Sequence, residues 1–466
     1  MSNKYLVKGV GVSVLASSIC SAVAKDIDKA QKPNIIIVVA DDLGWGDVGY
    51  HGSEIKTPNI DKLSEKGIQL NRFYVAPISS PTRAGLLSGK YPNRLGIRED
   101  VIPPWRDYGI ESNEVLLPQE LAKAGYDNRA ILGKWHLGHS RKAYWPLSKG
   151  FTHFYGHLNG AIDYFTHERD GELDWHNDWE SSYDKGYSTD LIAQHAVKCI
   201  QEYSKAGPYL LYVAFNAPHE PLQAKDDDLK LYGFDESKPR FGKDKTGHGN
   251  NQEQTYNAMV TCMDRGIGDI LKALDATGQS ENTIFLFLSD NGAAVGSSGS
   301  LRGKKFLEFE GGVRSPAILN WPARLKGGQT INQVLGFVDI MPTLLDVVKQ
   351  KSSVKFDGIS MLPVLTGDKK TIDRKLYLGV GAVVTNEWKF IEKGHNPKMK
   401  LEKNQLFRID VDPNEKNNVI DENKKRADEL LKFVQFYDAL IPSRIMPEYG
   451  EGRDEFVAPK EWKITK

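Results

Sequence analysis

The sequence predicts an α/β protein built on a large, mainly parallel sheet sandwiched by helices. Apolar runs rich in β-branched and aromatic residues on both pleat faces are typical of strands covered on both sides. Such runs occur at 34–42, 209–221 and 283–292. Helix-like segments separate them, at 57–67, 188–207 and 251–278. This alternation of strand and helix favours a parallel sheet with helices on both faces.

The C-terminal part has a different pattern, which predicts a second, smaller unit. Short alternating pieces are followed by one helical stretch, as in a small antiparallel sheet packed on a helix. These segments lie at 375–380, 387–393, 404–412 and 423–440. We place the boundary near residue 367, which gives a catalytic domain at 25–367 and a C-terminal α+β subdomain at 368–466.

The first 24 residues have the features of a secretory signal peptide. Lys4 and Lys8 precede an apolar run that ends at Ala22-Val23-Ala24, a small-residue cleavage pattern. The run is shorter than the ~20 residues that a membrane span needs, so we expect no span. Ile19 is too bulky for a lipoprotein site at Cys20. We expect an exported protein, periplasmic or secreted.

Composition excludes several other classes of protein. The formal charge of the 466 residues balances at +0, so no global field would attract nucleic acid. Outside the predicted signal peptide only Cys199 and Cys262 remain, too few for a disulfide framework, and neither is assigned a function.

Polar side chains follow two of the predicted strands directly. Asp41 and Asp42 end the first strand, and Asp290 and Asn291 end the third. In open parallel sheets the site forms beyond the carboxyl ends of the strands, so these groups should meet there. Three buried carboxylates would repel each other without a cation, and all-oxygen ligation favours Ca²⁺ or Mg²⁺ over zinc.

Cationic and imidazole groups accumulate in the same part of the predicted fold. They are Arg83, Lys134, His136, His219, Lys304 and Lys305. Around an oxygen-ligated cation, these groups suit a tetrahedral oxyanion, with lysine and arginine stabilising charge while histidine transfers protons.

The stretch SSPTRAGLLSGKYPNR at 79–94 resembles the signature of the sulfatase family, in which a Cys or Ser precedes Pro and Arg at fixed spacing. Aligning Pro81 and Arg83 to this signature makes Ser79 the residue that the family oxidises to formylglycine. Further matching segments lie at 34–47, 133–138, 217–221, 289–292, 301–314 and 405–419. The resemblance runs from about residue 33 to about residue 425.

This resemblance implies an alkaline-phosphatase-like fold and one calcium ion. The implied ligands are Asp41, Asp42, Asp290, Asn291 and the modified residue 79. Arg83 would hold the modified residue, Lys134 and His136 would flank it, and His219 and Lys305 would contact the sulfate. The loop register favours Lys305 over Lys304, which takes a position that glycine usually holds.

A hydrated aldehyde at position 79 would release sulfate from the covalent intermediate more readily than an unmodified serine could. One of its two hydroxyls attacks sulfur, and the other collapses back to the aldehyde and expels sulfate, so no second attack by water is needed. We favour His219 over His136 as the acid that protonates the leaving oxygen. The family resemblance implies that a serine precursor needs an oxygen-independent radical maturase as a partner.

Two other functions remain open from the sequence. A phosphatase, phosphodiesterase or phosphonate hydrolase of the same fold would use unmodified Ser79. Such sites commonly add a second metal, and here Lys134, His136 and Lys305 would take its place. A non-catalytic sugar-binding relative would use the aromatic-rich segment 154–180 as a platform.

The substrate predicted from the sequence is a sulfated polysaccharide fragment, either algal, such as ulvan or carrageenan, or a glycosaminoglycan. Export and the polar insert at 154–180 favour a sugar-sized leaving group over a lipid. Besides Lys134, His219, Lys304 and Lys305, the candidate sugar contacts are Arg98, His157, Asp163, His167 and His176.

Overall fold

A computed structural model describes residue 1 and residues 32–98, 100–242 and 246–464. Apart from Met1, the predicted signal peptide lies outside the described residues, and so does Cys20. Lys32–Lys466 forms one compact unit. None of the helices in the described ranges has both the length and the apolar character needed to cross a membrane.

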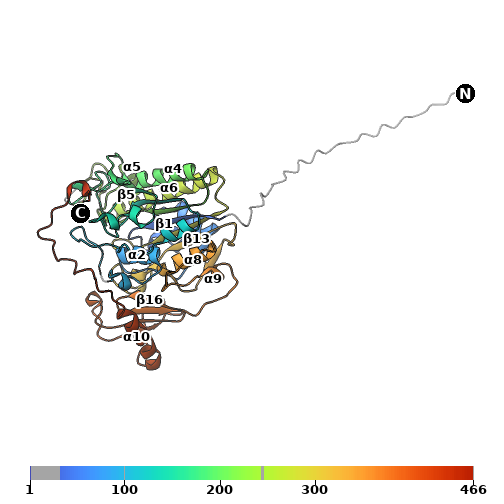
Figure 1. Cartoon of the computed structure of the whole chain (residues 1–466), viewed down its shortest axis with the longest axis vertical. Coiled ribbons are helices and arrows are strands. Elements are labelled where there is room, and N and C mark those ends of the chain that lie inside the picture. Colours follow the sequence, from blue (N-terminus) through green and yellow to red (C-terminus); the bar gives the residue numbers. More distant parts are fainter. Residues whose placement is uncertain (2–31, 99, 243–245, 465–466) are drawn as a thin grey trace. The chain divides into compact units, whose positions relative to one another are not determined.

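A ten-stranded sheet organises the main part of the chain (Figure 1). Its centre is parallel: β1 (Asn34–Ala40) lies between β11 (Thr283–Ser289) and β10 (Tyr209–Ala214), followed by β4 (Asn128–Lys134) and β5 (His153–His157). The outer strands are β13 (Ala317–Asn320), β2 (Ile68–Leu70), β14 (Gln329–Ile331), β8 (His176–Asn177) and β9 (Glu180–Ser181). The α/β class is confirmed, and antiparallel pairings at β13 and β8 make the sheet as a whole mixed.

Helices cover both faces of this sheet because its central strands are apolar on both sides. In β1, Ile35 and Ile37 belong to one hydrophobic cluster, and Ile36 and Val38 belong to the other. The first cluster includes residues of α2 (Ser79–Ser88), α3 (Leu117–Lys123) and α8 (Ile340–Val347). The second includes residues of α1 (Pro58–Lys66), α4 (Ser188–Tyr203), α5 (Asp226–Lys230) and α6 (Gln252–Ala276).

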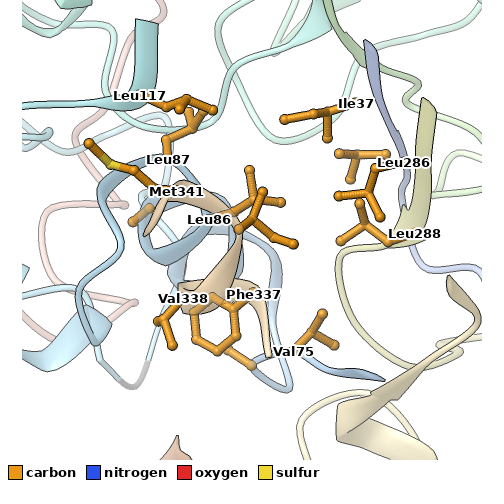
Figure 2. Packing of buried hydrophobic residues seen from close by; sticks show 14 of the residues in the cluster. Ile37, Val75, Leu86, Leu87, Leu117, Leu286, Leu288, Phe337, Val338 and Met341 are labelled. Carbon is orange, nitrogen blue, oxygen red and sulfur yellow. The ribbon is translucent and has the colours of Figure 1, made fainter. Parts of the chain in front are cut away.

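Helix α2 is fixed against the sheet along its whole length, since all its residues are buried. Figure 2 shows Leu86 facing the sheet residues Leu286 and Leu288, and Leu87 lying beside Leu117. Gly85 allows the close approach of Phe337, because a Cβ there would lie 2.1 Å from that ring. This packing sets the position of Ser79, the first residue of the helix.

The small C-terminal sheet is antiparallel, as predicted. Its strands are β16 (Lys375–Gly379), β17 (Ala382–Thr385), β18 (Trp388–Ile391) and β19 (Gln405–Arg408), and α10 (Lys424–Asp438) packs on it. Leu376 and Val384 also join the core of the main sheet. The domain boundary near residue 367 stays a prediction.

Shorter elements complete the described chain. The remaining strands are β3 (Phe73–Tyr74), β6 (Glu168–Arg169), β7 (Glu172–Leu173), β12 (Arg314–Ser315) and β15 (Leu335–Gly336), and the remaining α-helices are α7 (Glu310–Val313) and α9 (Leu362–Leu365). The 3₁₀ helices are Trp45–Asp47, Gly49–His51, Pro92–Leu95, Lys142–Tyr144, Pro146–Lys149, Phe337–Asp339, Pro397–Met399 and Lys460–Trp462.

Candidate active site

The polar residues that follow β1 and β11 lie side by side. Ala40 and Ser289 are paired in the parallel ladder, so the residues that follow them leave the sheet together. The backbone N–H of Asp42 donates to Asp290 Oδ1 at 3.2 Å, and Asn291 Nδ2 donates to Asp42 Oδ1 at 2.7 Å. Asp42 has φ 69°, a left-handed conformation that is costly outside glycine and concentrates at functional sites.

These buried oxygens form a site that fits a cation. Asp41 Oδ1 and Asn291 Oδ1 are buried and receive no hydrogen bond in the described structure. Burial, with the neighbouring carboxylates Asp290 and Asp42, raises the pKa of Asp41 well above its usual value despite Lys134 and Arg83. One ligand atom each from Asp41, Asp42 and His219 lies within 4.8 Å of the others. Carboxylate and amide oxygens suit Ca²⁺.

Ser79 lies at the centre of this group. Its hydroxyl donates to Asp290 Oδ2 at 2.7 Å and accepts from Arg83 Nε at 2.9 Å. Arg83 Nη2 also donates to Asp290 Oδ2 at 2.8 Å. Burial, the largest single influence, opposes ionisation of Asp290, but Arg83, Lys134, Lys305 and the Ser79 hydroxyl together outweigh it and hold the pKa of this carboxyl below its usual range. The α2 hydroxyl is therefore held between a carboxylate and a guanidinium.

Two lysine ammonium groups reach the same carboxylates. Lys134 Nζ donates to Asp41 Oδ2 at 2.6 Å, and Lys305 Nζ donates to Asp42 at 2.6 and 2.8 Å. Burial lowers the pKa of Lys134 to about 8 although Asp41 opposes this. Lys304 Nζ instead donates to the Gly296 carbonyl at 3.0 Å and is exposed. The geometry thus places Lys305, not Lys304, beside Asp42.

The two histidines of the group have different surroundings. His136 Nδ1 lies 3.3 Å from Ser79 Oγ, and its backbone has φ 58°. Burial and the nearby Lys134 lower the pKa of His136 well below its usual value. His219 Nε2 lies 3.7 Å from Asp42 Oδ2, and 22% of its side chain is exposed. Burial lowers the pKa of His219 to about 3. His136 therefore contacts the serine, and His219 has access to solvent.

The candidate sugar contacts do not gather around Ser79 as one set of open side chains. His157 and His176 are fully buried, and His157 Nδ1 lies 2.9 Å from the Asn159 carbonyl. His176 Nε2 lies 3.1 Å from Asp174 Oδ1, and His167 Nε2 lies 3.0 Å from the Gly186 carbonyl.

Asp163 accepts from two backbone N–H groups of its own turn, at 2.8 Å each. Arg98 lines a pocket with Phe306 and Lys398, two residues that sequence reasoning missed. The missed signal was an aromatic residue directly after Lys305.

The fold and these contacts define a class of protein: an α/β protein of the alkaline-phosphatase-like type, with a buried hydroxyl beside oxygens that could hold a cation. The family model "Sulfatase" matches residues 33–350, and the model "N-sulphoglucosamine sulphohydrolase, C-terminal" matches residues 301–435. The chain belongs to the sulfatase family, whose members are sulfuric ester hydrolases.

Individual relatives agree with this family assignment. The chain is 34% identical to mouse arylsulfatase J over 342 residues, 70% of this chain and 54% of the relative. It is 34% identical to mouse N-acetylgalactosamine-6-sulfatase over 366 residues, 72% of this chain and 66% of the relative. The chain thus spans about half of the first relative and about two thirds of the second.

A solved structure is also similar over most of its length. The structure of Ps i-CgsB in complex with k-i-k-neocarrahexaose has a TM-score of 0.78 and 29% identity, covering 91% of this chain and 97% of that one.

Proposed function

We propose that this chain is an exported sulfatase that hydrolyses sulfate esters on oligosaccharides derived from sulfated polysaccharides. The observation that carries the proposal is the Ser79 hydroxyl, held by Arg83 and Asp290 beside buried oxygens that receive no hydrogen bond. Export rests on the pattern of residues 1–24 alone.

The residues that would hold calcium are Asp41, Asp42, Asp290 and Asn291, together with position 79. The acceptors on Asp41 and Asn291 that lack hydrogen bonds support this assignment. When bound, calcium supplies a positive charge that lowers the pKa of a hydroxyl and neutralises a sulfate oxygen.

Oxidation of Ser79 would give the formylglycine aldehyde, and addition of water would give a hydrate with two hydroxyls on one carbon. One hydroxyl would attack sulfur, and collapse of the other to the aldehyde would release sulfate without attack of water on sulfur. Arg83 Nε, 2.9 Å from Ser79 Oγ, would hold an oxygen at this position. A radical maturase would be the partner that carries out the oxidation.

The other side chains of this site would bind the sulfate, donate a proton and orient position 79. Lys305, and Lys134 behind it, present ammonium groups to an entering sulfate. His219 is the better donor of a proton to the leaving oxygen, because its partly exposed ring can exchange protons with solvent. His136 contacts Ser79 and would orient position 79.

The lysines also favour sulfate over phosphate. Lys134 and Lys305 lie against Asp41 and Asp42, where a two-metal phosphatase would need ligands for a second cation. An ammonium group there adds less charge than a divalent ion, which suits the smaller charge of a sulfate ester.

The sugar class is supported by the relatives. One of them is named for N-acetylgalactosamine, and the solved structure of Ps i-CgsB contains a neocarrahexaose. We propose a carrageenan, ulvan or glycosaminoglycan fragment as the substrate of this chain.

Mass spectrometry of the peptide that carries Ser79 tests the proposal. Coexpression with a radical maturase should remove about two mass units from position 79, as oxidation of an alcohol to an aldehyde requires. Free sulfate should then appear from sulfated oligosaccharides, and Ser79→Ala should lower its release by roughly 10⁴-fold or more.

Ser80→Ala is the matched control, because Ser80 Oγ donates to the His136 carbonyl rather than to Asp290. Phosphate release with unoxidised Ser79 would instead support a phosphatase function. Sugar binding by the oxidised protein without sulfate release would support a non-catalytic sugar-binding function.

Thermal unfolding tests the cation site separately. A cation at 100 times its Kd stabilises the folded protein by about 2.7 kcal/mol. Calcium should therefore raise the Tm of the wild type and raise that of Asp41→Asn much less. Equal shifts for both proteins would place the ion elsewhere.

A further inference from the structure

A pocket that includes Ile78, the residue before Ser79, lies between the main part of the chain and the segment that follows β18. Its cavity volume is about 170 Å³. It is lined by Ile78, Arg98, Phe306, Glu308, His395 and Lys398, among others. The first four belong to the main part of the chain, and the last two follow β18. Both parts of the chain are therefore needed to form the pocket.

Backbone and side-chain contacts connect this pocket to the proposed sulfate site. Ile78 directly precedes Ser79, and Phe306 directly follows Lys305. The Phe306 N–H donates to the Pro77 carbonyl at 2.9 Å. Lys305 Nζ lies 5.5 Å from the centre of the Phe306 ring. A group bound on this ring would be adjacent to the ammonium that faces the sulfate.

Phe306 is held in an unfavourable state. Its φ of 74° is rare for a residue with a Cβ, and 43% of its side chain is exposed. Such a conformation persists only where the surroundings impose it. Here Pro77 accepts from its N–H, and Asn396 Nδ2 donates to its carbonyl at 2.7 Å. An exposed aromatic ring fixed beside a polar pocket suits stacking on a sugar ring.

The pocket lining carries the cations Lys398 and Arg98 together with the carboxyl groups of Asp100 and Glu308. Lys398 Nζ lies 4.1 Å from the centre of the Phe306 ring, and its charge also lowers the pKa of the buried Glu308. Arg98 Nη2 donates to Asp438 Oδ1 at 2.7 Å, which fixes the direction of the guanidinium. Glu308 is only 1% exposed, and its Oε2 accepts from Asn396 at 2.8 Å.

We propose that this pocket binds the saccharide next to the sulfate ester, with Phe306 as the platform, and that Lys398 and Arg98 select saccharides carrying a second acid group. That group is a further sulfate or a carboxylate, since both accept charge-assisted hydrogen bonds from Lys and Arg. The inference rests on the proposed sulfatase function and narrows its substrate class.

The test compares kcat/KM for pairs of oligosaccharides that differ only in a second sulfate or carboxylate. The matured wild type should prefer the doubly charged member. Lys398→Gln should lower this preference about tenfold, the effect of losing one hydrogen bond to a charged group. Lys393→Gln is the matched control, because Lys393 is exposed on the same segment and does not line the pocket. It should leave the preference unchanged.

The role of Phe306 is tested by substituting it and measuring kcat/KM for oligosaccharides with and without the second acid group. Phe306→Ala should lower kcat/KM about three- to tenfold for both members of a pair, because stacking does not depend on the second acid group. Phe306→Tyr keeps an aromatic face and should therefore retain most of the wild-type kcat/KM.

An unchanged preference in Lys398→Gln, with sulfate release by the wild type intact, would overturn the inference and leave the proposed function standing. If the matured wild type releases sulfate from no ester, the proposed function and the inference both fail.

Discussion

Two clusters of buried charge lie at opposite ends of one segment, residues 305–310, and they differ in how completely their charges are paired. The site cluster contains Asp41, Asp42, Asp290, Arg83, Lys134 and Lys305. The junction cluster contains Glu310, Glu415, Lys389, Arg314 and Tyr74, and it joins the separate three-stranded sheet of β12, β3 and β15 to the small C-terminal sheet.

In the junction cluster the carboxylate oxygens have close partners. Lys389 Nζ lies 2.9 Å from both Glu310 Oε1 and Glu415 Oε1, and the Glu310 N–H donates to Glu415 Oε2 at 2.7 Å. In the site cluster Asp41 Oδ1 receives no hydrogen bond and lies 3.7 Å from Arg83 Nη2. Buried charge alone therefore does not mark a functional site. Acceptors without a close donor, next to a partly exposed His219, distinguish the site that can take up a ligand.

Removing the junction lysine should have the largest effect on stability. Lys389→Met leaves Glu310 and Glu415 buried without their ammonium partner, and breaking a buried pair in this way costs about 3–5 kcal/mol. Urea unfolding should show this loss, while turnover by the folded fraction stays close to that of the wild type.

Lys375→Met gives the matched comparison on the same small sheet. Lys375 Nζ pairs with Glu429 at 2.7 Å, but both side chains are more than a third exposed. An exposed pair contributes about 0–1 kcal/mol. Equal losses for the two variants would mean that the junction cluster is no more important than a surface ion pair.

Replacing the site lysine should instead affect turnover. Lys305→Ala removes a charged donor next to Asp42, and the loss of one such donor lowers kcat by about 10²–10³-fold. Lys304→Ala removes only an exposed donor to the Gly296 carbonyl and should change kcat by about twofold or less. The measurement is the rate of sulfate release by the two variants at matched formylglycine content. Equal losses of kcat would contradict the different roles assigned to Lys304 and Lys305.

Features that depend on local patterns were predictable from the sequence. The apolar run before Asp41 predicted β1, and a buried parallel strand must end in polar residues at the carboxyl edge. The pairing of Ala40 with Ser289 then brings Asp42 and Asn291 together, as expected. The roles of these residues in catalysis stay predictions.

Features that depend on contacts distant in sequence were not predictable in this way. The antiparallel edge strands β13 and β8 are short and lack a distinctive period. The platform at Phe306 needs Asn396, 90 residues away, to hold its backbone. His157 and His176 were candidate sugar contacts because they lie in the polar insert 154–180, but both are packed in the interior with protein partners.

Between the two clusters, Glu308 should make the stability of the protein depend on pH. Burial raises the pKa of Glu308 to about 7 from 4.5, although Asn396, Lys389 and Lys398 oppose this. The folded protein therefore holds a proton that the unfolded chain releases, so this stabilisation is complete below pH 4.5 and is lost as pH rises through about 7. The slope is at most about 1.4 kcal/mol per pH unit for one proton.

Glu308→Gln removes this proton and should flatten the fall in unfolding free energy between pH 4.5 and about 7. Glu402→Gln, at an exposed position, should leave the curve of the wild type unchanged. Urea unfolding at several pH values measures both. Parallel curves for wild type and Glu308→Gln would mean that Glu308 is ionised in the folded protein, and that a full negative charge, rather than a neutral acid, lies between the two clusters.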